Sequence, residues 1–485
     1  MTSQLQTSLA DGAAAVLYTT DEMVAATAGT LSGAPGAVRG LSIDTRTLAP
    51  GDAFFAITGE NSDGHAYVDK ALAAGAALCV VAADRAGTFP AGAPLLVVRD
   101  VLAALVDLAR AARARTTARI VAVTGSVGKT STKEALRLAL AADGETHASA
   151  ASYNNHWGVP LSLARLPRTA RYGVFEVGMN HPGEITPLVE LVRPHVAVIT
   201  TVEAVHAAYF TGIEQIADAK AEIFDGLGAD GVAVLNADNP LLPRLRMRAD
   251  EKGVGRIVTF GAAEGADVRL KEVALQPAGS VAVVDVLGTE VTLKVPMPGR
   301  HVVQNMLAVL AAVKLAGADL ALAALALARL EPPPGRGRPL TLALAGGGAT
   351  LVDESYNANP ASMCAALDVL GRAPVGPKGR RIAVLGDMLE LGPESPAHHA
   401  GLAGPIGAAG IDQVYCAGPL MHALWEALPA QRRGGYAEHA AQLEPMVAAA
   451  IRAGDTLMVK GSNGSRMGPL VKGLVERFRA APAPA

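Results

Sequence analysis

Short runs of apolar, often β-branched residues alternate with longer stretches of helical periodicity in the middle of the chain. The runs cover residues 120–124, 172–177, 195–201, 232–235 and 257–260. Such alternation is typical of βαβ units, in which helices join parallel strands and cover both faces of the sheet. The pattern therefore predicts a central, mostly parallel α/β domain.

Two breaks bound this central pattern. An amphipathic helix at residues 101–115 is expected to close an N-terminal domain, with Thr116 and Thr117 as the link to the next strand. Further on, three consecutive prolines at 332–334 are followed by a Gly-Arg-Gly-Arg segment. Consecutive prolines prevent a helix from continuing and the glycines permit turning, so a third domain is expected to begin there.

The last part of the chain has its own apolar runs, at 350–352, 381–385 and 456–459, with alanine-rich helical stretches between them. These runs predict a second α/β sheet, of Rossmann-like type. The expected α/β fold thus has three domains, which cover residues 1–116, 117–331 and 332–485.

The chain has 485 residues, half of them hydrophobic, and a formal net charge of −3. Because no dense block of Lys or Arg attracts polyanions, neither nucleic acid nor an anionic bilayer is expected as a partner. The most membrane-like stretch, residues 307–330, contains Lys314, Gly317 and Asp319. Those residues oppose membrane insertion, so the stretch is interpreted as two core helices broken near Gly317.

The three cysteines, Cys79, Cys364 and Cys416, lie far apart in apolar segments and form no CxxC or Cys/His cluster. Buried, reduced thiols are therefore expected, rather than disulfides or zinc ligands. The N-terminus lacks a basic segment followed by an apolar one, which argues against a secretory signal. The expected location is the cytoplasm and the expected state is a monomer.

Residues 120–131, with the sequence IVAVTGSVGKTS, combine a strand, a glycine-containing turn and a helix start. Backbone N–H groups and the helix dipole at such a turn bind phosphate. Lys129 adds a positive charge, and Thr130 offers a hydroxyl to a magnesium ion between the phosphates. Val123 stands where the general P-loop has its first glycine, which leaves a shortened form. An ordinary strand-to-helix turn is the alternative, and the loop alone does not choose between kinases, ATPases and ligases.

The loop and five later segments together resemble the Mur ligase family, and within it the member that adds D-alanyl-D-alanine. The segments are TGSVGKTSTKE at 124–134, YNNHWGVPL at 153–161, EVGMNHPGE at 176–184, AKAEI at 219–223, DESYNANP at 353–360 and LGDMLELG at 385–392. Several segments in one order are more specific than any single motif. The resemblance implies an ATP-dependent ligase that joins D-alanyl-D-alanine to a UDP-linked muramoyl tripeptide through an acyl phosphate, in cell-wall synthesis.

The resemblance also implies an ATP and magnesium site. The residues expected to hold ATP are Thr124, Gly125, Ser126, Val127, Gly128, Lys129, Thr130, Ser131, Asn305 and Arg336, with Arg338 as the alternative to Arg336. The residues expected in catalysis are Lys129, Glu176, His206 and Lys220. Two magnesium ions would be held by Thr130, Glu176, His206 and Lys220, the last of these carbamylated.

Each assignment has a physical basis and a structural alternative. Glu176 ends an apolar strand, where a carboxylate reaches the ligand-binding edge of a parallel sheet. Lys220 lies in a helical segment, where a lysine is ordinarily a solvated surface residue; desolvation would favour the neutral amine that carbamylation needs. His206 is otherwise a solvent-exposed loop histidine, and Asn305 a polar residue near a helix N-terminus.

Substrate-binding residues are implied in both outer domains and, at Asn155, in the central domain. Thr45 and Arg46 resemble the family's UDP-sugar module, and would otherwise belong to a strand and turn. The other residues expected to bind substrate are Asn155, Glu354, Tyr356, Asn357, Asn359, Lys460 and Ser462. For the cluster at 353–360 the alternative is capping and turn chemistry.

Three other functions are weighed against this one. The nearest is another amide ligase of the same superfamily, such as a diaminopimelate- or lysine-adding enzyme or folylpolyglutamate synthetase. A phosphotransferase would form a phosphorylated product without an amine acceptor. A non-catalytic nucleotide-binding module would bind ATP and show no substrate-dependent hydrolysis.

Overall fold

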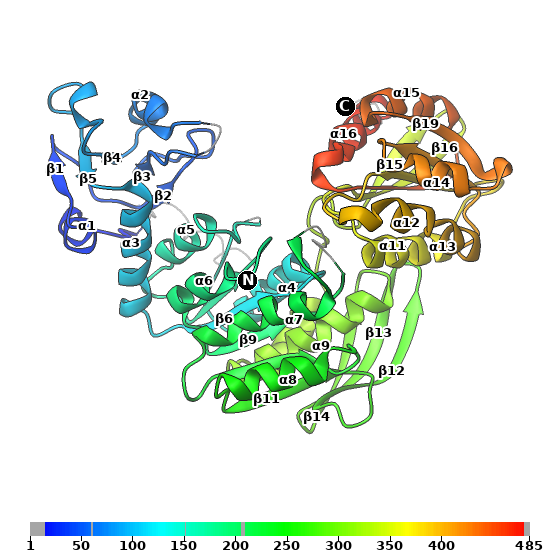
Figure 1. The fold of residues 1–485 in the computed structure, drawn as a ribbon, viewed down its shortest axis with the longest axis horizontal. Coiled ribbons are helices and arrows are strands. Elements are labelled where there is room, and N and C mark those ends of the chain that lie inside the picture. Colours follow the sequence, from blue (N-terminus) through cyan, green and yellow to red (C-terminus); the bar gives the residue numbers. More distant parts are fainter. Residues whose placement is uncertain (1–14, 60–61, 151, 205–208, 480–485) are drawn as a thin grey trace, which may run out of the picture. The chain divides into compact units, whose positions relative to one another are not determined.

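The computed structural model describes residues 15–59, 62–150, 152–204 and 209–479. Within these residues the chain forms three sheets, of five, nine and six strands, with helices packed on them (Figure 1). The α/β class predicted from the alternation of strand and helix patterns is confirmed.

The N-terminal sheet has the order β1-β5-β4-β3-β2. Its elements are α1 (Thr20–Thr27), β1 (Thr30–Ser32), β2 (Gly40–Ser42), β3 (Asp52–Phe55), α2 (Val68–Ala73), β4 (Leu78–Ala82), β5 (Leu95–Val98) and α3 (Val101–Arg115). Strands β2 to β5 pair in parallel, and β1 pairs antiparallel with β5. Helix α3 has the predicted bounds because Asp100 caps it: its carboxylate accepts a hydrogen bond from Ala103 N at 2.7 Å.

The central sheet has the order β14-β13-β12-β11-β10-β9-β6-β8-β7. Its strands are β6 (Arg119–Thr124), β7 (Thr146–Ala148), β8 (Tyr172–Glu176), β9 (Val196–Ile199), β10 (Val232–Asn236), β11 (Arg256–Gly261), β12 (Val268–Gln276), β13 (Gly279–Val286) and β14 (Thr289–Val295). The five predicted strands are all present, although β9 is shorter than expected. Strands β9, β10 and β11 are parallel, whereas β12, β13 and β14 form an antiparallel meander that the sequence analysis did not predict.

The helices of this region are α4 (Lys129–Ala141), α5 (Gly158–Ala164), α6 (Ile185–Val192), α7 (Ile213–Ala221), α8 (Leu242–Glu251), α9 (Arg300–Leu315) and α10 (Leu320–Leu327). Helices α9 and α10 are the predicted pair, and Gly317 lies between them with a positive φ of 79°. Among the helices of the described ranges, none has the length and hydropathy needed to cross a membrane.

The C-terminal sheet has the order β15-β16-β20-β17-β18-β19. Its strands are β15 (Arg338–Leu344), β16 (Gly347–Glu354), β17 (Arg381–Gly386), β18 (Gln413–Ala417), β19 (Arg433–Ala437) and β20 (Thr456–Lys460). Its helices are α11 (Pro360–Arg372), α12 (Ser395–Ala400), α13 (Ala403–Ala408), α14 (His422–Ala427), α15 (Ala440–Ala450) and α16 (Met467–Arg477). Apart from the antiparallel pair β15 and β16, the strands pair in parallel.

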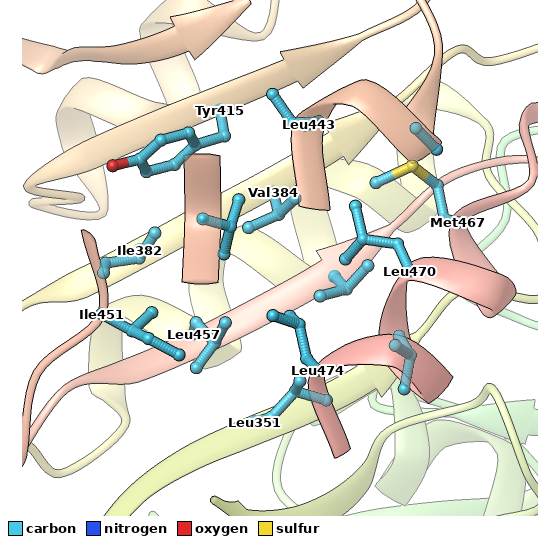
Figure 2. Packing of buried hydrophobic residues seen from close by; sticks show 14 of the residues in the cluster. Leu351, Ile382, Val384, Tyr415, Leu443, Ile451, Leu457, Met467, Leu470 and Leu474 are labelled. Carbon is cyan, nitrogen blue, oxygen red and sulfur yellow. The ribbon is translucent and has the colours of Figure 1, made fainter. Parts of the chain in front are cut away.

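Both faces of this sheet are covered by apolar helices, as expected of a Rossmann-like domain. On one face, Val384 and Leu457 of the strands pack with Leu443 of α15 and Leu470 of α16 (Figure 2). On the other face, Met363 and Leu367 of α11 belong to a second buried cluster. Loops at the carboxyl edge of the sheet are thereby fixed from both sides.

The chain divides into two compact units. The first consists of residues 1–122, 144–178 and 186–194, and the second of residues 123–143, 179–185 and 195–485. The bounds of the three domains expected from sequence stay a prediction.

The cysteine prediction is partly wrong. Cys79 and Cys416 are buried, but Cys364 is exposed. Cys364 lies on α11, whose buried positions are Met363, Ala366, Leu367 and Leu370, so its side chain leaves the helix on the other side.

Candidate active site

The phosphate loop connects the end of β6 to the start of α4, the arrangement that its sequence predicts. Gly125 and Gly128 both have a positive φ, of 146° and 87°, which residues other than glycine rarely adopt. Gly128 directly precedes the helix, which begins at Lys129. The loop thus ends at the N-terminus of a thirteen-residue helix, where N–H groups and the helix dipole favour an anion.

Two loop side chains are already engaged by the protein. Lys129 Nζ donates a hydrogen bond to Gly125 O at 2.7 Å. Ser126 is buried, and its hydroxyl donates to Glu203 O at 3.0 Å and accepts from Glu203 N at 2.9 Å. Thr130 is buried in the first turn of α4 and Ser131 follows it there. Ser126 therefore braces the loop against the segment after β9.

Thr200 also holds the phosphate loop in place, although it was not predicted from the sequence as a site residue. Thr200 N donates to Thr124 O at 3.0 Å, and Thr200 Oγ1 lies 2.5 Å from Val127 O. A Cβ placed on Gly125 would lie only 2.0 Å from Thr200 Oγ1. The first loop glycine is therefore required both by its φ and by this close approach. The only sequence signal for Thr200 was its place at the end of the predicted strand 195–201.

Lys220 of α7 is buried, with 2% of its surface exposed, and is not the solvated surface residue that a helical lysine usually is. Burial lowers its pKa well below the usual value, and the charge of Lys129 lowers it further. An unprotonated amine at neutral pH is the form that reacts with carbon dioxide to give a carbamate.

Glu176 lies at the end of β8 and is 1% exposed. Its Oε1 accepts a hydrogen bond from Asn154 Nδ2 at 2.8 Å, while its Oε2 is buried without a hydrogen-bond partner in the described part of the chain. An unpartnered buried carboxylate oxygen is costly unless a cation binds it, so Glu176 fits a magnesium ligand.

Asn154, the hydrogen-bond partner of Glu176, was not among the residues selected from the sequence, whereas its neighbour Asn155 was expected to bind substrate. Asn155 Oδ1 accepts a hydrogen bond from Gly158 N at 3.0 Å and so caps α5. The segment 153–161 thus supplies the partner of Glu176 and the cap of α5, and substrate binding by Asn155 stays a prediction.

His206 lies outside the described residues, and its role stays a prediction. Across the described ranges, no cluster of three or more His, Cys, Asp or Glu side chains is arranged as a metal site. The predicted magnesium ligands, which are a hydroxyl, a carboxylate, a histidine and a carbamate, are not a cluster of this kind and stay a prediction.

Asn305 of α9 lies against the phosphate loop. A Cβ placed on Gly128 would lie 2.7 Å from Asn305 Nδ2 and 2.9 Å from Asn305 Oδ1. Because Gly128 has no side chain, the Asn305 amide can lie next to the start of α4. This position suits an amide that binds part of a nucleotide whose phosphates occupy the loop.

The two candidate arginines of the interdomain segment differ in environment. Arg336 is half-buried, with its guanidinium 4.3 Å from the centre of the Tyr356 ring, whereas Arg338 is exposed at the start of β15. Such stacking orients Arg336 and joins it to one of the predicted substrate residues. Tyr356 itself is 38% exposed and remains accessible to a ligand.

Lys460 links two of the candidate substrate-binding segments. Its side chain is buried, and Nζ donates to Glu354 Oε2 at 3.3 Å and to Asn357 O at 2.9 Å. Next to it, Ser462 Oγ accepts a hydrogen bond from Leu389 N at 3.0 Å. The structure thus joins loops that follow β16, β17 and β20 at the carboxyl edge of the sheet, where α/β proteins bind ligands.

Asn359 has a structural role that the sequence analysis gave as the alternative. It is the N-cap of α11: its side chain accepts from Ser362 N, and Ser362 Oγ accepts in turn from Asn359 N. Its amide is thus engaged in a capping box, one of the stronger helix-start motifs.

In the N-terminal domain, Thr45 and Arg46 lie in a turn after β2. Arg46 donates three side-chain hydrogen bonds to Asp44, Nε to Oδ1 at 2.9 Å and to Oδ2 at 3.0 Å, and Nη2 to Oδ2 at 2.6 Å. Its side chain is 82% exposed. These bonds lower the pKa of Asp44. The pair holds an exposed guanidinium in a defined orientation.

Three family models match most of the chain in succession. The model of the Mur ligase family catalytic domain matches residues 37–113, that of the Mur ligase middle domain residues 123–313, and that of the Mur ligase glutamate ligase domain residues 337–463. The candidate residues described above fall within these matches, except Arg336, which directly precedes the third.

Named relatives and solved structures agree with these matches. The chain is 36% identical to UDP-N-acetylmuramoyl-tripeptide--D-alanyl-D-alanine ligase of Escherichia coli (strain K12), over 92% of this chain and 96% of the relative. It is 32% identical to the ligase of that name from Bacillus subtilis (strain 168), over 90% of this chain and 93% of the relative.

Among solved structures, MurF from Acinetobacter baumannii matches with a TM-score of 0.80 and 29% identity, over 95% of this chain and 99% of that one. MurF from Thermotoga maritima in complex with ADP matches with a TM-score of 0.72 and 25% identity, over 91% and 99%. Similarity of this extent covers the N-terminal, central and C-terminal sheets together. The chain therefore belongs to the Mur ligase family.

Proposed function

We propose that this enzyme is an ATP-dependent ligase that adds D-alanyl-D-alanine to UDP-N-acetylmuramoyl-tripeptide, giving the pentapeptide precursor of peptidoglycan. The observation that carries the proposal is the end-to-end similarity to ligases of this name, over 92% of the chain in the E. coli case. The phosphate loop, the Asn305 amide beside it and the ADP complex of a similar structure support ATP as the nucleotide.

The proposed reaction has two steps. First, a terminal carboxylate oxygen of the tripeptide attacks the γ-phosphorus of ATP, which gives an acyl phosphate and ADP. Then the amine of D-alanyl-D-alanine attacks the acyl carbon, so that a C–N bond forms, the C–O bond to phosphate breaks and the amine loses a proton. Lys129 and the N–H groups at the start of α4 would stabilise the transferring phosphoryl group.

Magnesium, when bound, would neutralise charge on the phosphate oxygens and so favour both steps. The ligands we propose are Thr130, Glu176, His206 and carbamylated Lys220, for two ions. The orphaned Oε2 of Glu176 and the buried, easily deprotonated amine of Lys220 support this set. Formation of the carbamate joins the Lys220 amine to carbon dioxide and releases one proton.

The outer domains would bind the two peptide substrates. We assign the UDP part to Thr45 and Arg46. We also assign Asn155, in the central domain, to substrate binding. We assign D-alanyl-D-alanine to the loops that Lys460 joins, which contribute Glu354, Tyr356, Asn357, Asn359 and Ser462. We assign Arg336, which precedes β15, to ATP. We further propose three domains at residues 1–116, 117–331 and 332–485, a monomeric state and a cytoplasmic location.

The test is phosphate release combined with mass detection of product, with each component omitted in turn. The components are the purified enzyme, ATP, magnesium, UDP-muramoyl tripeptide and D-alanyl-D-alanine. We expect phosphate release that needs both peptide substrates, together with a pentapeptide mass. Release that does not need the dipeptide would instead indicate a phosphotransferase or ATPase. A product with a single amino acid in place of the dipeptide would indicate another amide ligase.

A further inference from the structure

We propose that Thr200, Asn236 and Gln304 are positioning residues that hold the phosphate loop and Asn305 in register, so that both ends of a nucleotide are bound together. The proposal rests on the proposed use of ATP. It adds three residues, none of which the sequence pattern marks as a nucleotide ligand, and it is carried by one closed path of contacts.

The path begins at the peptide between Val127 and Gly128. Thr200, which is 1% exposed, places its Oγ1 at 2.5 Å from Val127 O. In a trans peptide the C=O and N–H groups point in opposite directions. Because Thr200 holds the Val127 carbonyl on the side of β9, the N–H of Gly128 points to the other side. That orientation turns a donor, rather than a carbonyl oxygen, toward a bound phosphate.

The second contact continues from the backbone of Thr200. Asn236 ends β10 and is buried; its Nδ2 donates to Thr200 O at 3.2 Å. Its Oδ1 accepts from Asp238 N at 2.9 Å and from Gln304 Nε2 at 3.1 Å. Asn236 thus uses both ends of its amide, and a buried amide that loses either partner is destabilised.

The third contact ties α9 to the same edge of the sheet. Gln304 Nε2 donates to Asn236 Oδ1 and also to Asp238 Oδ2, the latter at 2.7 Å. The next residue on the helix is Asn305, whose amide would lie within 2.9 Å of a Cβ on Gly128. The path therefore returns to the peptide at which it began.

Because the path is closed, the position of the phosphate loop and the position of Asn305 depend on each other. A shift of α9 would move Asn305 and also pull on Asn236 and Thr200, and so on the Val127 carbonyl. The expected consequence is that substitutions in the path impair binding of the nucleotide and leave binding of the dipeptide unchanged, since the dipeptide is assigned to loops of the C-terminal sheet.

The experiment compares Thr200→Val, Thr200→Ser and Gln304→Leu with a matched control, Thr259→Val. Thr259 is a buried strand threonine whose hydroxyl bonds to Asp267, so its loss removes a similar bond away from the path. The measurements are the Kd for ADP by calorimetry, the KM values for ATP and D-alanyl-D-alanine, and the thermal midpoint of each variant.

We expect Thr200→Val to weaken ADP binding and raise the KM for ATP by about tenfold, because a methyl group cannot donate to Val127 O. Thr200→Ser should restore both, and Thr259→Val should change neither. Gln304→Leu, at a partly exposed position, should weaken ADP binding and raise the KM for ATP. It also serves as the test if Thr200→Val does not fold. The KM for D-alanyl-D-alanine should stay at the wild-type value throughout.

Folded Thr200→Val and Gln304→Leu proteins with wild-type ADP affinity would overturn the proposal. So would a Thr259→Val protein with the same loss of affinity, because the effect would then be one of stability. The proposed ligase function is tested separately. If the wild-type enzyme binds ADP but forms no pentapeptide, the ligase function is wrong. The ADP affinities of the variants still test whether Thr200 and Gln304 position the phosphate loop.

Discussion

The charge of Lys129 in the phosphate loop lowers the pKa of Lys220, a buried lysine of α7 whose pKa is already depressed by desolvation. Lys220 is thereby disposed to lose its proton. This relationship supports carbamylation of Lys220 more strongly than the sequence motif alone does.

The first prediction concerns this carbamate. We expect the enzyme to lose activity in buffer freed of carbon dioxide and to regain it when bicarbonate is added. Lys220→Arg, which introduces a cation that cannot form the carbamate, should lower kcat by about 100-fold or more and show no response to bicarbonate. Steady-state rates with and without bicarbonate are the measurement, and Lys472→Ala on the exposed face of α16 is the control. Equal rates with and without carbon dioxide would contradict the prediction.

A second prediction concerns the unpartnered oxygen of Glu176. Glu176→Gln keeps an acceptor for Asn154 but removes the negative charge, so it should raise the magnesium concentration needed for half-maximal activity by about tenfold. The magnesium dependence of the rate is measured at saturating ATP. Glu190→Gln, an exposed glutamate of α6, should leave that dependence unchanged. If both variants behave alike, Glu176 is not a metal ligand.

The third prediction concerns His399, which is buried in the C-terminal domain. Met388 N donates to its Nε2 at 3.0 Å, and Nδ1 donates to Ser395 O at 2.7 Å, so the ring is neutral when folded. Burial lowers its pKa. The unfolded chain therefore takes up a proton first as the pH falls below about 6.5, and the stability of the folded state decreases from that point downward.

The measurement is the free energy of unfolding in urea at several pH values between 8 and 5. In the wild-type protein this free energy should fall with decreasing pH more steeply than in His399→Gln, by up to about 1.4 kcal/mol per pH unit. His422→Gln serves as the control, because half of that side chain is exposed. Parallel pH profiles for wild type and His399→Gln would exclude a neutral, buried His399.

The fourth prediction uses the three cysteines as reporters of the fold. Burial raises the pKa of Cys79 and of Cys416 to about 12, so near pH 8 both are protonated as well as inaccessible. Cys364 is exposed and should be the one thiol that reacts with an aromatic disulfide reagent in the folded protein. We expect three reactive thiols in denaturant. If more than one thiol reacts rapidly with the reagent in the folded protein, Cys79 and Cys416 are not both buried.

Local signals account for what the sequence predicted well. The strand, glycines and helix start of the phosphate loop are consecutive, and the Asp100 cap fixes the start of α3 within one turn. The break near Gly317 is likewise encoded at one position. Each of these features depends on residues within a few positions of each other, which is the range over which patterns are informative.

What the sequence did not predict depends on contacts between distant residues. Thr200 and Val127 are 73 positions apart, and Asn154 and Glu176 are 22 apart. Helical periodicity placed Lys220 in a helix but could not tell that its side chain is buried. Cys364 was expected to be buried because its neighbours in sequence are apolar, but it lies on the exposed side of α11.

The central claim, a ligase that works through an acyl phosphate, is tested most directly by following one oxygen atom. UDP-muramoyl tripeptide labelled with ¹⁸O in its terminal carboxylate is converted with ATP and D-alanyl-D-alanine, and the released phosphate is analysed by mass spectrometry. The proposed steps transfer one carboxylate oxygen to phosphate, so the phosphate formed with each pentapeptide should carry one ¹⁸O atom. Unlabelled phosphate alongside pentapeptide would contradict the account.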